Sequence, residues 1–379
     1  MSNTITNLVP DLYSALDVVS RELVGFIPSV SSDMTFERAA VGQTVRSPVA
    51  PAASAGDITP AVTPPDDGDQ TIGNVSMSIT KARRVPVRWN GEQSLGLNNN
   101  GVGRSRIMVD QFAQAMRTLC NEVEADIAAT HIAASRAYGT AGTTPFASTL
   151  GDAAQIRKIL ADNGSPLSDV SLVMDTAAGA SLRTLGNLTK ANEAGTTALR
   201  EQGVLLNIYG MALRESAQTV TNTAGTGASY QVNNGSGYAV GATSIAVDTG
   251  SGTVLAGDIV TFAGDSNKYV VATALASGTL VLAAPGLKKA LADNTAMTVV
   301  AAAARNLAFA RSAIALATRA PALPVEGDSA SDRMIITDDR SGLSFEVAMY
   351  KQYRQVQYEV SLAWGVKAVK PEHMAILLG

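Results

Sequence analysis

Cysteine and histidine are nearly absent from this chain of 379 residues, which contains one cysteine and two histidines. The single Cys120 excludes an internal disulfide framework and a thiolate metal cluster. Its neighbours are apolar residues of a predicted helix, so we expect a buried small hydrophobic side chain. His131 has no second ligand one helical turn further on, and His373 follows Pro371 in a predicted turn. Neither spacing suits zinc.

Charge is also scarce. Charged residues make up 16% of the chain and hydrophobic residues 46%, whereas about a quarter of a typical chain is charged. Such a chain has little polar side-chain surface, so we expect much of its outer face to lie against other chains. The net charge of -4 is too small for a dedicated nucleic-acid binder or a membrane-surface protein. With neither a signal sequence nor an apolar run of about 18 residues, we expect a location in the cytoplasm or in something assembled there.

Catalytic motifs are missing as well. The sequence has no phosphate-binding loop, no dinucleotide-binding glycine motif and no nucleophile elbow. The acidic group Asp66, Asp67 and Asp69 lacks the alternating ligands and distal glutamate of a calcium loop, so we interpret it as a solvated loop tip. We therefore predict no catalytic residue, no cofactor and no metal, although an enzyme with a carboxylate or hydroxyl site stays open as an alternative.

Two extended arms flank a proline-rich tip. Apolar residues alternate with polar ones from Val41 and again from Val75 to Trp89, and residues 46–73 between them hold five of the 14 prolines. A projecting hairpin of this kind is unstable alone and needs a surface to lie on. A disordered linker is the alternative, which the long, regular return alternation disfavours. Arg83 and Arg84 on the return arm indicate either a solvated strand face or contact with an acidic patch on a neighbouring chain. The expected subunit contacts are Pro60, Pro64, Asp66, Asp67, Arg83 and Arg84.

Periodicity predicts the other elements. The expected elements are a helix over 8–27, an uninterrupted helix over 105–137, a helix over 152–164, a strand over 169–175, a second short helix, a strand from 203, short strands over 219–300, a strand and short helix over 303–324, and a mostly extended final segment. The long helix would measure roughly 50 Å. A change of phase near Tyr353 predicts a bend or bulge. The apolar end, Met374 to Leu378, either completes a core sheet or meets a neighbouring chain.

Two stretches resemble the major capsid proteins of tailed bacteriophages. One is GLSFEV followed by a tyrosine-rich strand and WGVKAVKPEHMAIL, and the other is NLAFARSAIALATR at 306–319. The resemblance implies an α+β, Hong Kong 97-type fold. Residues 219–303 are similar to the inserted domain of Salmonella short-tailed-phage coat proteins. The expected parts are an N-terminal arm (1–40), an extended loop and strand pair (41–95), a spine helix and peripheral domain (96–150), an axial domain (151–218), an inserted β domain (219–303) and the axial and peripheral completion (304–379).

This resemblance implies a coat subunit that performs no reaction. Copies would form the hexamers and pentamers of an icosahedral shell around a scaffolding protein and a portal protein, with non-specific contact to packaged double-stranded DNA and no membrane. The expected location is the virion, assembled in the host bacterial cytoplasm. Some relatives weld subunits through a lysine, but Lys81, the only lysine of the extended loop region, lies away from the tip, so we predict no cross-links. An encapsulin-like cellular shell protein is the main alternative, which the predicted insertion disfavours.

Overall fold

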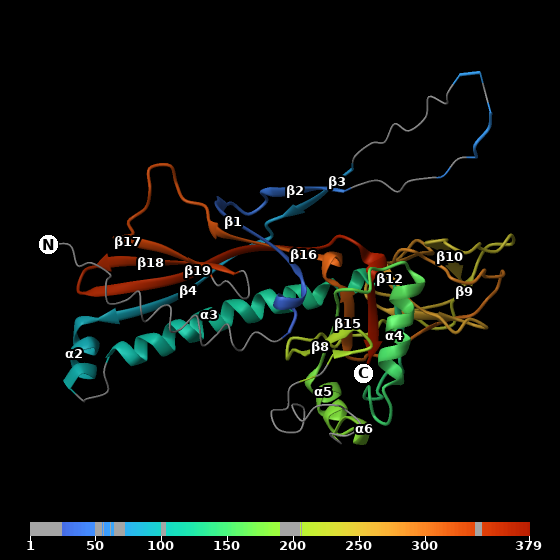
Figure 1. Cartoon of the computed structure of the whole chain (residues 1–379), viewed down its shortest axis with the longest axis horizontal. Coiled ribbons are helices and arrows are strands. Elements are labelled where there is room, and N and C mark those ends of the chain that lie inside the picture. Colours follow the sequence, from blue (N-terminus) through green and yellow to red (C-terminus); the bar gives the residue numbers. More distant parts are fainter. Residues whose placement is uncertain are drawn as a thin grey trace.

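The computed structural model describes residues 25–49, 55, 57–60, 62–63, 73–99, 104–189, 205, 207–337 and 343–379. All but the last three residues of the helix expected over 8–27 lie outside this range. Those three form a bend and the first residue of a short 3₁₀ helix, η2 (Ile27–Ser29). Two large sheets and a few helices make up the described chain, so the predicted α+β class is confirmed (Figure 1).

A long sheet forms one half of the molecule. Its strands are β1 (Ser31–Ala39), β16 (Ile314–Pro321), β19 (Gln355–Ala368), β18 (Ser344–Gln352), β17 (Asp332–Thr337) and β4 (Lys81–Asn90). β1 runs parallel to β16, and the other pairs are antiparallel. β18 and β4 pair with the same residues of β19, so they flank it on opposite edges. β19 is therefore the central strand of this half.

Helix α3 (Arg104–Ala128) lies along one face of the long sheet (Figure 1). At 25 residues it is a rod of about 37 Å. Its apolar stripe, which includes Phe112, Leu119 and Val123, is buried in one cluster with β4 and β19. The Phe112 and Tyr358 rings meet edge to face at 5.6 Å. This packing makes the helix and the sheet one rigid body.

The uninterrupted helix predicted over 105–137 is wrong in its last nine residues. α3 is followed by η3 (Ala129–Ala133) and strand β5 (Arg136–Tyr138). The backbone nitrogen and the hydroxyl of Ser135 both donate to the carbonyl of Met374, and β5 then pairs with two other strands. These sheet hydrogen bonds outweigh the helix propensity of the alanines in this stretch.

A second sheet forms the other half. It contains β7 (Asn207–Ile208), β8 (Met211–Glu215), β6 (Val170–Met174), β15 (Arg305–Ala310), β20 (Met374–Leu378) and β5. Helices α4 (Gly151–Asp162), α5 (Thr176–Arg183) and α6 (Gly186–Thr189) contribute to its hydrophobic cluster. The apolar chain end is β20, buried throughout between β15 and β5. Of the two alternatives for this end, completion of a core sheet is correct.

The single strand predicted from residue 203 is a hairpin instead. β7 and β8 are joined at Tyr209 and Gly210, which have φ values of 51° and 75°. Such positive values reverse the chain tightly.

The β-rich stretch follows the predicted pattern of short strands. It contains β9 (Gln231–Val232), β10 (Ser244–Asp248), β11 (Ile259–Phe262), β12 (Lys268–Ala276), β13 (Thr279–Leu282) and β14 (Met297–Val299). These strands share a hydrophobic cluster of their own, which includes Phe262 and Tyr269. β12 also pairs with β5, so the second sheet continues into them. The boundaries 219–303 as a separate domain stay a prediction.

Two further expectations are wrong. The helix predicted before Pro321 is strand β16, preceded by η4 (Arg311–Ala313). β16 lies between β1 and β19, and Leu316 and Ala317 are fully buried, so tertiary pairing overrides local propensity. The bend or bulge expected near Tyr353 is the two-residue turn of the β18–β19 hairpin, since Gln352 pairs with Gln355. A short 3₁₀ helix, η5 (Pro371–His373), precedes β20.

Candidate functional site

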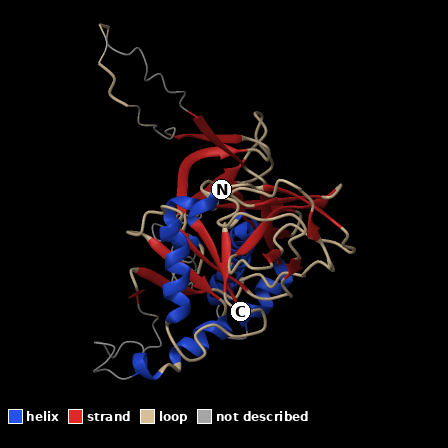
Figure 2. Cartoon of the chain, turned by 90° about the vertical axis from the view of Figure 1, so that its right-hand side faces the viewer, coloured by secondary structure: helices blue, strands red, loops and turns tan. Residues whose placement is uncertain are grey.

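The projecting hairpin consists of β2 (Thr44–Val49) and β3 (Gly73–Ser78), which form a two-stranded sheet separate from both large sheets. It stands away from the rest of the molecule (Figures 1 and 2). The extended conformation predicted for both arms is thus confirmed, but only the β3 part of the return arm belongs to the hairpin, because β4 pairs with β19 in the long sheet. Beyond the two strands of the hairpin, Ile58 and Val62 have relative exposures of 99% and 105%. Because isolated two-stranded ribbons are marginal in water, the exposed residues Ile58 and Val62 beyond the paired strands lack support from the described part of their own chain.

The base of the hairpin is nevertheless firmly held. Ile79 is fully buried, in a small cluster with Met77 and Ala363. The backbone nitrogen of Thr80 donates to the carbonyl of Trp364 at 2.9 Å. A Cβ atom on Gly365 would lie 2.1 Å from the carbonyl oxygen of Ser78. The close crossing of the chain over β19 therefore requires glycine at this position.

The predicted contact residues fall into three groups. Pro60 is exposed, whereas Pro64, Asp66 and Asp67 lie outside the described residues. Arg83 and Arg84 have acidic partners within their own chain. A guanidinium nitrogen of Arg84 lies 2.7 Å from a carboxylate oxygen of Glu359, and this hydrogen bond raises the pKa of Arg84.

Arg83 approaches α3. Its Nε lies 3.5 Å from a carboxylate oxygen of Glu122. The side chains of Arg83 and Arg84 keep relative exposures of 59% and 61%, so both ion pairs are weak surface pairs. Their contact with a neighbouring chain stays a prediction.

Lys81 is also engaged within the chain. Its Nζ lies 2.6 Å from one carboxylate oxygen of Asp126, and the indole nitrogen of Trp364 donates to the other oxygen at 2.8 Å. Asp126 on α3 thus joins β4 to β19. The absence of cross-links stays a prediction.

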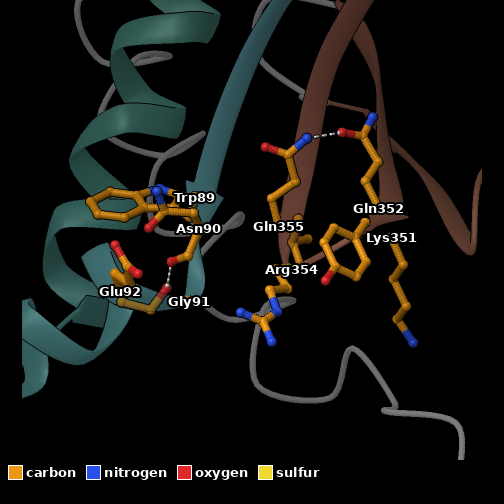
Figure 3. A pocket seen from close by; sticks show the side chains of 11 residues that line it. Trp89, Asn90, Gly91, Glu92, Lys351, Gln352, Arg354 and Gln355 are labelled. Carbon is orange, nitrogen blue, oxygen red and sulfur yellow. Dashed lines mark hydrogen bonds between the residues drawn. The ribbon is translucent and has the colours of Figure 1, made fainter.

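A groove opens at the far tip of the long sheet, where β18 turns into β19 beside α2 (Gly91–Asn99). Its volume is about 880 Å³. The lining residues are Trp89, Asn90, Gly91, Glu92, Ser94, Lys351, Gln352, Tyr353, Arg354, Gln355 and Val356. Figure 3 shows Trp89 and Glu92 on one side, with Lys351, Gln352 and Arg354 on the other.

Sequence reasoning missed this groove. Its two walls come from segments about 260 residues apart, which meet only because β4 pairs with β19. The signal available was Tyr353, an aromatic residue at the change of phase in a chain with 5% aromatics. Tyr353 is 86% exposed, and the guanidinium carbon of Arg354 lies 5.6 Å from the centre of its ring. The groove therefore presents an aromatic face beside two cations.

Burial shifts the pKa values of two titratable side chains in the described core. Burial lowers the pKa of His131, whose Nδ1 lies 3.1 Å from the carbonyl oxygen of Ala128. Burial raises the pKa of Glu124, which accepts hydrogen bonds from the backbone nitrogen of Ile27 and the hydroxyl of Ser216. Cys120 is buried in the core, as predicted. Across the described ranges, no three histidine, cysteine, aspartate or glutamate residues form a metal-binding group, and no helix is long and apolar enough to span a membrane.

Comparison with known proteins gives likenesses of structure. No family model and no curated protein matches the sequence. Similar solved structures include one from Mycobacterium phage Che8, with 12% identity, a TM-score of 0.44 and coverage of 91% of each chain. The capsid of cyanophage P-SCSP1u matches with 12% identity, a TM-score of 0.46 and coverage of 92% of this chain and 86% of that chain. A virus-like particle from Pyrococcus furiosus matches with 9% identity, a TM-score of 0.44 and coverage of 97% and 98%.

These likenesses concern the fold. Within the described residues, the elements also follow the order that the capsid resemblance implies. After β1, the extended hairpin β2–β3 is followed by the long helix α3, the second sheet with its helices, the β-rich stretch, and finally the strands that complete both sheets.

Proposed function

We propose that this chain is the major capsid protein of a tailed bacteriophage, which assembles with copies of itself into an icosahedral shell around double-stranded DNA. The β2–β3 hairpin is the observation that carries this proposal. It is anchored at its base by Ile79, yet its far end has no core of its own and exposes Ile58 and Val62. A neighbouring copy would supply the missing surface.

The body of the molecule suits such a subunit. Helix α3 and the long sheet pack into a rigid plate, with Trp364 and Phe112 fully buried between them. Asp126 and Lys81 tie the helix to the sheet edge. A rigid plate transmits the geometry of one subunit contact to the next, as closed symmetric assembly requires.

The proposal also covers the assembly partners of this chain and its location. Hexamers and pentamers of this chain would assemble in the host bacterial cytoplasm around a scaffolding protein and a portal protein. In the virion, a chain with a net charge of -4 would contact packaged DNA without sequence preference and without high affinity. The chain would act as a structural protein without catalysis.

Electron microscopy of the purified protein, expressed with and without the proposed scaffolding and portal proteins, tests the proposal. We expect closed shells tens of nanometres across, and DNA in shells recovered from infected cells. Shells filled with a cellular enzyme would replace the proposal by an encapsulin-like function. A chain that stays monomeric at high concentration with scaffolding and portal proteins present would refute self-assembly altogether.

Deletion of residues 50–70 isolates the role of the hairpin. Since these residues lie beyond the paired strands β2 and β3, we expect a folded monomer with unchanged circular dichroism that forms no shells. Normal shells from the deleted chain would show that the hairpin is not an assembly element.

A further inference from the structure

The chain contains four Asn-Gly dipeptides, which begin at Asn90, Asn100, Asn163 and Asn234. Glycine has no Cβ atom, so its backbone nitrogen approaches the preceding side-chain amide with little steric hindrance. We propose that Asn234 is a site of spontaneous deamidation, and that the carboxylate formed there opens the turn at residues 234–237. This turn follows β9, at the opposite end of the molecule from α2 (Figure 1). The reaction needs only water and the turn itself, so the inference is independent of the proposed function.

The reaction proceeds through a cyclic imide and involves neither oxidation nor reduction. The backbone nitrogen of Gly235 loses its proton to solvent hydroxide and forms a bond to Cγ of Asn234. The bond from Cγ to Nδ2 breaks, and Nδ2 leaves as ammonia with a proton taken from water. Water then opens the resulting succinimide at Cγ or at the backbone carbonyl carbon, which gives aspartate or isoaspartate. The net change is the uptake of one water molecule and the release of one ammonia molecule.

The turn leaves the nitrogen of Gly235 open to react. Gly235 is exposed, and its backbone nitrogen makes no hydrogen bond to the described residues. The side chain of Asn234 folds over the residues that follow it. The backbone nitrogen of Ser236 donates to its Oδ1 at 3.1 Å, and its Nδ2 donates to the carbonyl of Gly237 at 2.7 Å.

These two hydrogen bonds have different effects on the reaction. The N–H of Ser236 stabilises the negative charge that develops on Oδ1 as the nitrogen attacks Cγ. The bond from Nδ2 holds the amide in position but must break before ammonia leaves. Because Gly237 is only partly buried, water replaces this bond at the surface. The turn therefore supplies positioning and charge stabilisation to a nucleophile that is not otherwise engaged.

The pairs that begin at Asn90 and Asn163 provide internal controls, whereas Asn100 lies outside the described residues. In both control pairs the glycine nitrogen donates to a backbone carbonyl, at 3.2 Å for Gly91 and 3.0 Å for Gly164. The Nδ2 of Asn163 makes two further hydrogen bonds, at 2.9 and 2.8 Å. Attack at either site requires these bonds to break first, so both sites should react more slowly than Asn234.

Deamidation should open the turn. A carboxylate oxygen in place of Nδ2 cannot donate to the carbonyl of Gly237 and repels it instead. The new charge also lies beside Asp293, whose Oδ1 accepts from the backbone nitrogen of Asn234 at 2.8 Å. Like charges in neighbouring positions repel each other. The isoaspartate product in addition lengthens the backbone within the turn.

Peptide mass spectrometry of the aged full-length protein tests the proposal. The protein is kept in mildly alkaline buffer, which favours loss of the proton from the Gly235 nitrogen. We expect deamidation at Asn234 at least about tenfold faster than at Asn90 and Asn163, with isoaspartate among the products. In urea the three rates should become similar. An Asn234 that reacts no faster than the other two, or a difference that persists in urea, would overturn the inference.

Gly235→Ala is the matched variant. Its added Cβ would meet nothing within 4 Å, so the fold should be unchanged, but the Cβ hinders the approach of the nitrogen to Cγ. Deamidation at Asn234 should become about tenfold slower, while the rate at Asn163 should stay the same. Equal rates at Asn234 in the variant and the wild type would show that another route modifies this residue.

Asn234→Asp reproduces the charge of the product and tests the opening of the turn by hydrogen–deuterium exchange. The backbone nitrogens of Gly237 and Tyr238 both donate to carbonyls in the wild type. These amides should exchange roughly tenfold faster in the variant, while those of α3 keep their protection. Asn233→Asp is the control, because it adds the same charge at an exposed side chain. Equal exchange in the two variants would refute the opening of the turn.

Discussion

Replacing Gly365 by alanine should detach the projecting hairpin without unfolding the rest of the chain. The added Cβ would lie 2.1 Å from the carbonyl oxygen of Ser78, whereas ordinary contacts begin at 3.4 Å. The two backbones must therefore separate by more than about 1 Å. That shift breaks the 2.9 Å hydrogen bond from Thr80 to Trp364 and loosens the burial of Ile79.

The magnitude follows from these contacts. One lost hydrogen bond costs about 1 kcal/mol, and partial exposure of Ile79 costs about as much again. A local destabilisation of about 2 kcal/mol raises the opening equilibrium of the hairpin roughly 30-fold. Because β2 and β3 pair with no other strand in the described chain, the remaining core should keep its stability.

Hydrogen–deuterium exchange of the monomer measures this effect. Amides of β2 and β3 should exchange roughly 30-fold faster in the Gly365→Ala variant, while amides of α3 and β20 should keep their protection. Gly186→Ala is the matched control, since its Cβ would meet nothing within 4 Å and alanine favours the helix. Unchanged exchange in the hairpin, or equal loss of protection across the whole chain, would refute the proposed role of the crossing.

Three further predictions concern the core, and chemical denaturation measures each. Phe112→Ala should lower the free energy of unfolding by about 3–5 kcal/mol, because the ring is fully buried against Tyr358; the exposed Gln114→Ala should change it little. Burial raises the pKa of Glu124 in the folded chain. The wild type should therefore lose stability as pH rises from the unfolded pKa of about 4.3 through the higher folded pKa. Glu124→Gln should lack this loss, and equal pH profiles of the two proteins would contradict the prediction. Arg305→Met should stabilise the protein by about 1–4 kcal/mol. The buried guanidinium finds no hydrogen-bond partner in the described chain, and burial lowers its pKa to about 10. A destabilised variant would show that the charge of Arg305 is compensated in the folded chain.

Local pattern predicted those elements whose neighbours in space agree with their propensity. The strand at 170–174 is apolar apart from Ser171 and is buried along its whole length, and the helix at 151–162 has an apolar stripe that meets the second sheet. The two arms of the hairpin also alternate as they pair. In each case the hydrophobic period and the tertiary contacts point to the same structure.

The wrong elements are those in which long-range pairing decides. Residues 314–321 carry helix-forming alanines, but β1 and β19 lie on either side and leave room only for a strand. The end of the predicted long helix is likewise drawn into β5 by Met374, which lies about 240 residues further along the chain. No window of sequence contains both partners, so local pattern alone could not predict these results.

The predicted contact residues show the same contrast between what local sequence predicts and what long-range pairing decides. Arg83 and Arg84 are predicted contact residues because two cations interrupt an apolar alternation, and each faces a carboxylate. Both carboxylates belong to the same chain, Glu122 on α3 and Glu359 on β19. The sequence indicates that these cations need acidic partners, but the register of β4 against β19 determines which carboxylates lie near them.

The same register brings Trp89 opposite Val356 and so builds the groove. A shift of β4 by one residue would turn these side chains to the opposite faces of the sheet, separating Arg84 from Glu359 and removing Trp89 from the groove wall. The ion pairs on β4 therefore help to fix the register that creates the groove beside α2.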